Sequence, residues 1–232
     1  MTARSFQSGK IPLHHAKQEK QVMKKNTVQS ALVDEICGIE WELFSSVNNA
    51  GGRASCQNDP IFFKKMRSCQ FAGWDAPTLA SYRADLEDAR TEGRNPLAEK
   101  YAYMMKSTHP SEYESIKELL QIVSPEKEAL VKGIVRVMIK WEAEVDRLYP
   151  AMRSGGRPLT SDRDKPGTTS FETYLSGELK TYSERTLMRL SECVRANMDA
   201  GINMALLAAE QTALVYGYAS IAEAEKAAAA RL

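Results

Sequence analysis

The feature that most constrains this chain is the recurrence of apolar residues at spacings of three and four. It runs through three long stretches, residues 28–47, 130–148 and 175–190. This spacing places one apolar side chain per turn on the same face of an α-helix, whereas a half-buried strand would show strict alternation. The pattern predicts amphipathic helices with core-facing stripes, and therefore an all-α fold.

Helix starts are also readable in the sequence. Three of them pair a capping side chain with a proline: Asp59-Pro60, Asn95-Pro96 and Ser124-Pro125. The capping oxygen accepts from a backbone N–H, and proline lacks the N–H that would be unpaired at the first helical position. A fourth start is expected at Thr169, because Thr169 and Glu172 have the spacing of a capping box.

Length and composition indicate one domain. The chain has 232 residues, 43% of them hydrophobic, which is enough for one substantial core. We expect a single-domain bundle of about seven or eight helices, including shorter ones near residues 60–74, 76–92, 96–107 and 111–122. Two glycine-bearing stretches, 48–58 and 153–168, are expected to be long polar loops.

The two ends of the chain differ in composition from its centre. Residues 1–25 are basic without an apolar stretch, so we expect a flexible basic arm followed by the helical domain at 26–220. Docking of this arm on an acidic protein partner is an alternative interpretation. Residues 221–232 are rich in alanine and glutamate, and are expected to form a terminal helix or tail with little to pack against.

Charge and cysteine content exclude several classes of function. Lys+Arg number 31 and Asp+Glu 30, so no global positive field would attract nucleic acid. No apolar run approaches the roughly 18 residues of a membrane span, and no membrane partner is expected. The 4 cysteines form no C-x-x-C pair, which fits reduced thiols and a cytoplasmic location.

Glu40 is the most informative single residue. At 100° per residue it lies on the same face as Ile36, Phe44 and Val47, on the core-facing stripe. A buried carboxylate needs a cationic partner or several donors, because burying an unpaired charge is costly. The sequence leaves two interpretations open: a buried ion pair that supports the fold, or a general acid/base that orients a substrate.

Other candidate residues lie around Glu40 and in the two loops. Arg53 and Arg67 are the natural counter-charges, and Arg153 lies in a second basic loop with glycines. Glu172 is a second carboxylate on a core face, although a capping role would explain it without a ligand. The candidate set comprises two catalytic and seven substrate-binding residues: Glu40 and Glu172, and Arg53, Gln57, Arg67, Gln70, Tyr101, Arg153 and Tyr182.

No metal is expected, and the sequence identifies no cofactor. Glu40, Glu142, Glu172 and Glu178 raise the possibility of a carboxylate-bridged centre inside a bundle, but that architecture requires Glu-x-x-His pairs on two helices. The only histidine outside the basic arm is His109, next to a proline.

Two sequence segments carry a family resemblance. Trp41-Glu42-Leu43-Phe44 is followed by Asn49-Ala50-Gly51-Gly52-Arg53-Ala54-Ser55-Cys56-Gln57, and the likeness continues through residues 99–105 and 177–183. On these segments the chain resembles a bacterial domain-of-unknown-function family. The resemblance implies membership but no activity.

Two hypotheses of different class follow. The first is an enzyme or binder for a small, polar, anionic, amino-acid-like metabolite held in a pocket between helices. The second is a helical protein-protein interaction module without catalysis. A closed pocket with both glycine loops at its rim would favour the first, and an exposed apolar groove of several hundred Å² the second.

Overall fold

A computed structural model describes the backbone of residues 13–47, 52 and 55–232, with side chains from residue 27 onward apart from 48–51 and 53–56. This part of the chain is all-helical, which confirms the expected fold class. It contains α1 (Leu13–Ser45), α2 (Pro60–Gln70), α3 (Ala76–Thr91), α4 (Pro96–Thr108), α5 (Pro110–Ile116), α6 (Pro125–Leu148), α7 (Pro150–Arg153), α8 (Phe171–Leu179), α9 (Glu184–Asp199), α10 (Met204–Val215) and α11 (Ile221–Ala229).

The described residues thus form eleven α-helices, and the expected number of seven or eight was wrong. Three short 3-10 helices join them: η1 (Ser55–Asn58), η2 (Lys117–Leu119) and η3 (Ser161–Arg163). The periodic stretch 175–190 was expected to be one helix. It is broken between α8 and α9, where the Ser183 hydroxyl accepts from the Thr186 N–H at 3.1 Å and starts a new helix.

The three expected caps that stand directly before a proline are confirmed. The side chains of Asp59, Asn95 and Ser124 accept from backbone N–H groups at the starts of α2, α4 and α6. The fourth expected cap was wrong by one residue: Ser170 caps α8 by accepting from the Thr173 N–H.

Helices occupy both ends of the described part of the chain. α1 begins at Leu13, before the expected start of the helical domain, and residues 1–12 lie outside the described part. At the other end α11 packs on α7 and α10, with Ile221 and Ala224 buried in a small second cluster. The Glu225 carboxylate also accepts from the Ala151 and Met152 N–H groups of α7, at 2.9 and 2.7 Å. The last helix therefore has more packing than its composition suggested.

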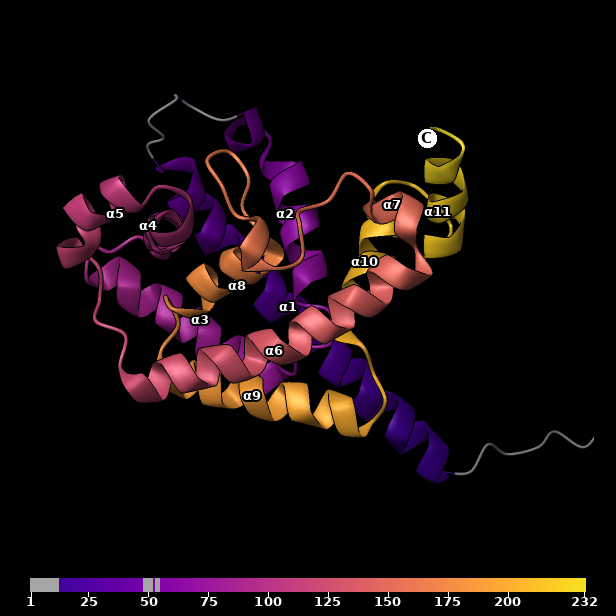
Figure 1. The fold of residues 1–232 in the computed structure, drawn as a ribbon. Helices are drawn as coiled ribbons and strands as arrows, with labels where there is room; N and C mark the ends of the chain where they lie inside the picture. The colour runs from indigo at the N-terminus through magenta and orange to yellow at the C-terminus, as the bar shows by residue number, and fades with distance from the viewer. Residues whose placement is uncertain (1–12, 48–51, 53–54) are drawn as a thin grey trace, which may run out of the picture.

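The short helix α8 lies in the middle of the bundle, with α4 and α6 packed against it (Figure 1). Gly177 makes the contact with α4 possible, since an added Cβ would lie 3.0 Å from the Lys100 carbonyl oxygen. Three consecutive residues, Gly177, Glu178 and Leu179, are buried, as expected of a helix covered on more than one face.

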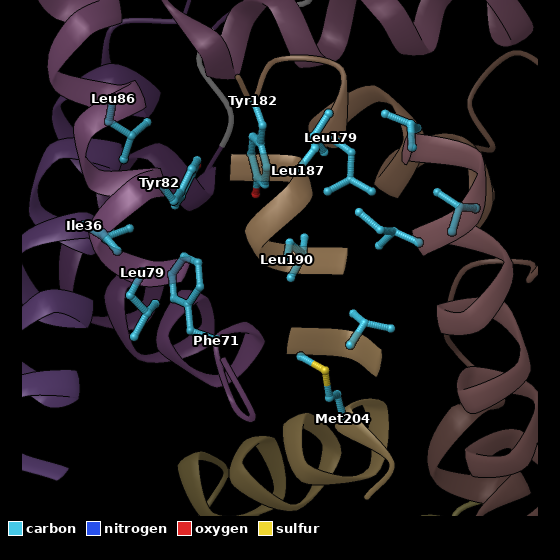
Figure 2. Close-up of a cluster of buried hydrophobic side chains, with 14 of the residues drawn as sticks. Ile36, Phe71, Leu79, Tyr82, Leu86, Leu179, Tyr182, Leu187, Leu190 and Met204 are labelled. Atoms are coloured by element: carbon cyan, nitrogen blue, oxygen red, sulfur yellow. The ribbon is translucent and has the colours of Figure 1, made fainter. Parts of the chain in front are cut away.

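The main core joins α1, α3, α6, α8 and α9 around two tyrosines. Tyr82 of α3 and Tyr182, just after α8, face each other across this core with ring centroids 4.4 Å apart (Figure 2). Ile36, Leu86 and Leu187 are fully buried beside them. None of the helices in the described ranges combines the length and the apolar content that a membrane-spanning segment needs.

Candidate functional site

The site begins with an ion pair between α1 and α2. The carboxylate of Glu40 is fully buried, and Arg67 donates to both of its oxygens, from Nε and Nη2, at 2.7 Å each. Arg67 is one of the two partners expected for Glu40 from the sequence. The Arg67 Nη1 group donates to the side-chain oxygen of Gln70, so three of the candidate residues lie together.

A second ion pair joins the same guanidinium to α8 and α4. Arg67 Nη2 donates to Glu178 Oε1 at 2.5 Å, and Lys100 Nζ donates to Glu178 Oε2 at 2.6 Å. All four side chains are less than 10% exposed. We call Glu40, Arg67, Lys100 and Glu178 the charge centre; it contains two carboxylates and two cations, so its formal charges cancel.

Two tyrosine hydroxyls complete the charge centre. Tyr82 donates to Glu40 Oε1 at 2.6 Å and Tyr182 donates to Glu178 Oε1 at 2.8 Å. Burial, together with these neighbouring carboxylates, raises the pKa of both phenols well above the ordinary value. The phenols therefore stay protonated and act as donors, which stabilises the two carboxylates as anions.

The electrostatics favour the charged forms of Glu178 and Lys100. Burial alone would raise the pKa of Glu178, but Arg67 and Lys100 outweigh it and hold this pKa well below its ordinary range. Burial likewise opposes the charge of Lys100, yet Glu178 raises the Lys100 pKa above its ordinary value. Glu178 is thus a poor proton acceptor near neutral pH, because its charge is already satisfied.

A cavity of about 590 Å³ lies next to the charge centre, between α2, α6, α8, α9, α10 and α11. Arg67, Gln70, Glu178 and Tyr182 form part of its wall, and Glu40 does not line it. The remaining wall is largely apolar and aromatic, and includes Phe71, Trp74, Ile134, Met138, Phe171, Tyr174, Leu175, Leu190, Met204, Tyr216 and Tyr218. We call it the central cavity.

Basic side chains lie at the exposed edge of the central cavity. Arg153 is bound by Glu142 and Asp146, at 2.7 Å each. Arg157 is exposed, donates to the Thr169 carbonyl at 3.1 Å and lies over the Tyr174 ring, and Arg231 donates to the Tyr218 hydroxyl. Within the described part of the chain, Arg157 and Arg231 form no ion pair with a carboxylate. The mouth of the cavity therefore has an excess of positive charge.

Glu142 is the carboxyl in this wall that holds its proton to a higher pH than usual. Burial raises its pKa above the ordinary value, although Arg153 opposes the change. A carboxyl that binds protons more readily than usual, and that borders a cavity, has the properties of a general acid.

Three candidate residues, Gln57, Glu172 and Tyr101, lie away from the central cavity. Gln57 is buried and donates to the carbonyls of Phe44 and Val47, at 2.9 Å each, which satisfies the end of α1. The Glu172 carboxylate accepts from the Ser161 N–H at 2.7 Å, and half-buried Tyr101 is absent from the wall. Arg53 lies outside the described residues, so the expected meeting of the two glycine loops rests on residues that the structure does not describe.

Sequence reasoning missed two members of the charge centre, Lys100 and Glu178. Glu178 was considered among four carboxylates of a possible metal centre, on a stretch expected to be one helix, whereas α8 is a separate central helix. Both residues lie in the segments 99–105 and 177–183 that carry the family resemblance, which was the available signal. Among the described side chains, no group of three or more His, Cys, Asp or Glu residues could hold a metal ion.

Comparison with known proteins places the chain in a family. A family model described as "Protein of unknown function (DUF4125)" matches residues 30–226. The match covers most of the chain and ends within α11, so the chain belongs to the DUF4125 family. No curated protein and no solved structure matches the chain significantly.

Proposed function

We propose that this protein is a single helical domain that binds a small amphipathic anion, such as an amino-acid-like carboxylate, in the central cavity. The observation that supports this most directly is the charge of the cavity wall. Four arginines and two glutamates line it, and the two arginines at the mouth, Arg157 and Arg231, have no carboxylate partner among the described residues. Arginine donors match a carboxylate well, and the aromatic wall suits an apolar ligand body.

In this proposal the charge centre positions residues instead of reacting. Glu40 already accepts three hydrogen bonds and does not line the cavity. Its role is to hold the Arg67 guanidinium, which does line the cavity, in one orientation. Tyr174 links this centre to the mouth, since Lys100 Nζ lies 3.5 Å from its ring centroid and the Arg157 guanidinium carbon 4.7 Å.

A catalytic form of the proposal would use Glu142. Its raised pKa favours proton donation to a bound anion, with Arg153 holding the carboxyl in place. The cavity also supports a small-molecule function over the alternative of an interaction module, because a largely apolar, concave site between helices with a few polar groups in its wall suits a small ligand.

The free thiols fit a reducing compartment, and we propose the cytoplasm. Cys37, Cys69 and Cys193 are free and buried, and burial with the nearby Glu40 raises the Cys37 pKa to about 12. Such thiols are unreactive near neutral pH.

A thermal-stability screen tests the binding proposal. The panel pairs amphipathic carboxylates with their uncharged amides, and an acid present at 100 times its Kd should stabilise by about 2.7 kcal/mol, while its amide should not. Arg157→Gln/Arg231→Gln should weaken binding of that acid at least tenfold. Arg195→Gln, at an exposed α9 position outside the cavity, is the control. Equal stabilisation by acids and amides, or equal weakening by the control, would contradict the proposal.

A further inference from the structure

A second cavity, of about 750 Å³, lies on the opposite side of α8 from the first. Its wall consists of residues from α4, α6 and α8, together with Ser161 and Lys180. It shares no lining residue with the central cavity: Thr173, Ser176 and Gly177 of α8 border this one, whereas Tyr174, Leu175 and Glu178 border the other. We call it the α6 groove.

Positive charge dominates the α6 groove. Five basic residues line it, Lys106, Lys132, Arg136, Lys140 and Lys180, against two acidic ones, Glu128 and Glu172. The Glu128 carboxylate lies 3.7 Å from Lys132 Nζ and 3.5 Å from Lys180 Nζ. Within the described residues, no ion pair forms on the remaining three cations, Lys106, Arg136 and Lys140. The five cations outnumber the two carboxylates, so positively charged groups are available to bind an anion.

Three of these cations follow one another along α6 at intervals of four residues. Lys132, Arg136 and Lys140 consequently lie on the same face, where neighbouring like charges repel and weaken the helix. With a rise of about 1.5 Å per residue, they span roughly 12 Å. Repulsion of this kind has no benefit for the fold, and a ligand with several negative charges along its length would relieve it.

The floor between these cations is apolar. Val131 and Val135 are buried, and Ile139 is half-buried beside them. The α6 groove therefore combines a row of cations with an apolar surface that can contact an uncharged ligand body.

We propose that the α6 groove binds a small organic molecule that carries several phosphate groups. Each phosphate presents strongly accepting oxygens and at least one full negative charge, and several in a row match a row of Lys and Arg side chains better than single carboxylates do. The cavity volume is far larger than one phosphate requires. The apolar floor accounts for the organic part of the ligand.

Calorimetric titration at fixed ionic strength, with EDTA present, tests this proposal. Orthophosphate, pyrophosphate and tripolyphosphate should bind with increasing affinity, and adenosine triphosphate should bind more tightly than tripolyphosphate because of the apolar floor. Citrate serves as the tricarboxylate comparison and should bind at least tenfold more weakly than tripolyphosphate. Binding of citrate as tight as that of tripolyphosphate, or no gain from the organic group, would overturn the ligand class.

The location is tested with two charge-matched double variants. Arg136→Gln/Lys140→Gln should weaken tripolyphosphate binding at least tenfold. Lys65→Gln/Arg195→Gln removes the same charge at exposed positions outside the groove, and should change the Kd by less than twofold. All four residues are exposed, so circular dichroism should show unchanged folding in both. Equal weakening by the two variants would mean nonspecific attraction and would refute the site.

Discussion

The charge centre and the mouth of the central cavity are neighbouring regions that both contain charged side chains, but the charges are paired differently in the two. In the charge centre, every charge has an opposite one within 2.7 Å, and the tyrosine hydroxyls supply further bonds. At the mouth of the central cavity, the partners of Arg157 and Arg231 among the described residues are a carbonyl, a hydroxyl and an aromatic ring. The first arrangement is complete without a ligand, whereas the second leaves donors free for one.

The difference separates residues of the fold from residues of the binding site. Removing charges from water is costly, and the charge centre offsets that cost only through its own pairs. Any change that leaves one of its charges unpaired should reduce stability. At the mouth, water solvates the arginines, so the same kind of change should affect binding alone.

The largest effect is expected from Arg67→Gln. It leaves the Glu40 and Glu178 carboxylates buried with Lys100 as the one remaining cation, and should lower the free energy of unfolding by about 3–5 kcal/mol or more. Glu40→Gln should cost a similar amount, because Arg67 then loses its bidentate partner. Urea denaturation followed by circular dichroism measures both. A loss below about 1 kcal/mol in either variant would mean that the centre does not support the fold.

Gly177→Ala should have an intermediate effect. The added Cβ would lie 3.0 Å from both the Lys100 carbonyl oxygen and Met104 Cγ, so α4 and α8 must separate, at a cost of about 1–3 kcal/mol. Gly133→Ala in α6 is the matched control, since its Cβ meets nothing within 4 Å. That control should stabilise by up to about 1 kcal/mol through helix propensity. In parallel thermal melts, Gly177→Ala should lower the stability and Gly133→Ala should raise it. A change of the same sign in both variants would contradict the prediction.

Lowering the pH should reduce the difference in the free energy of unfolding between the parent protein and Glu178→Gln. The folded-state pKa of Glu178 lies below its ordinary 4.5, so the stability this group contributes is complete above about pH 4.5. Below that pH the unfolded chain binds the proton first, and the contribution is lost as the pH falls through the lowered folded pKa. Urea midpoints of both proteins between pH 7 and pH 3 should therefore converge. Parallel curves would exclude Glu178 as the titrating group.

The smallest effect on stability is expected from Arg157→Gln. Arg157 is exposed and forms no ion pair with a described carboxylate. Its replacement should therefore change the free energy of unfolding by no more than about 0.5 kcal/mol. The thermal shift produced by a carboxylate from the screen should nevertheless decrease. A destabilisation as large as that of Arg67→Gln would remove the distinction between the two regions.

The sequence predicted those parts of this arrangement that depend on local structure. The caps at Asp59, Asn95 and Ser124 act within one helical turn, so their partners were readable. Glu40 could be found because it interrupts the apolar stripe of a long helix. The burial of Glu178 could not be predicted, because a short helix surrounded by others has no single apolar stripe. Its pairing with Lys100 could not be predicted either, because it joins residues 78 positions apart. Arg153 was identified as a candidate because it begins a glycine-bearing stretch. Its position at a cavity depends on the packing of α11, and the composition of that segment had predicted little packing.

The place of α8 between two cavities has a consequence for how its sequence can vary. Thr173, Ser176 and Gly177 border the α6 groove, while Tyr174, Leu175 and Glu178 border the central cavity. Most helices tolerate substitution on the face that meets solvent, and α6 has such exposed positions, among them Gly133. α8 has no exposed residue at all. In a saturation-mutagenesis experiment, α8 should therefore appear as an unbroken block of sensitive positions, without the three-to-four-residue rhythm of tolerance that marks a surface helix.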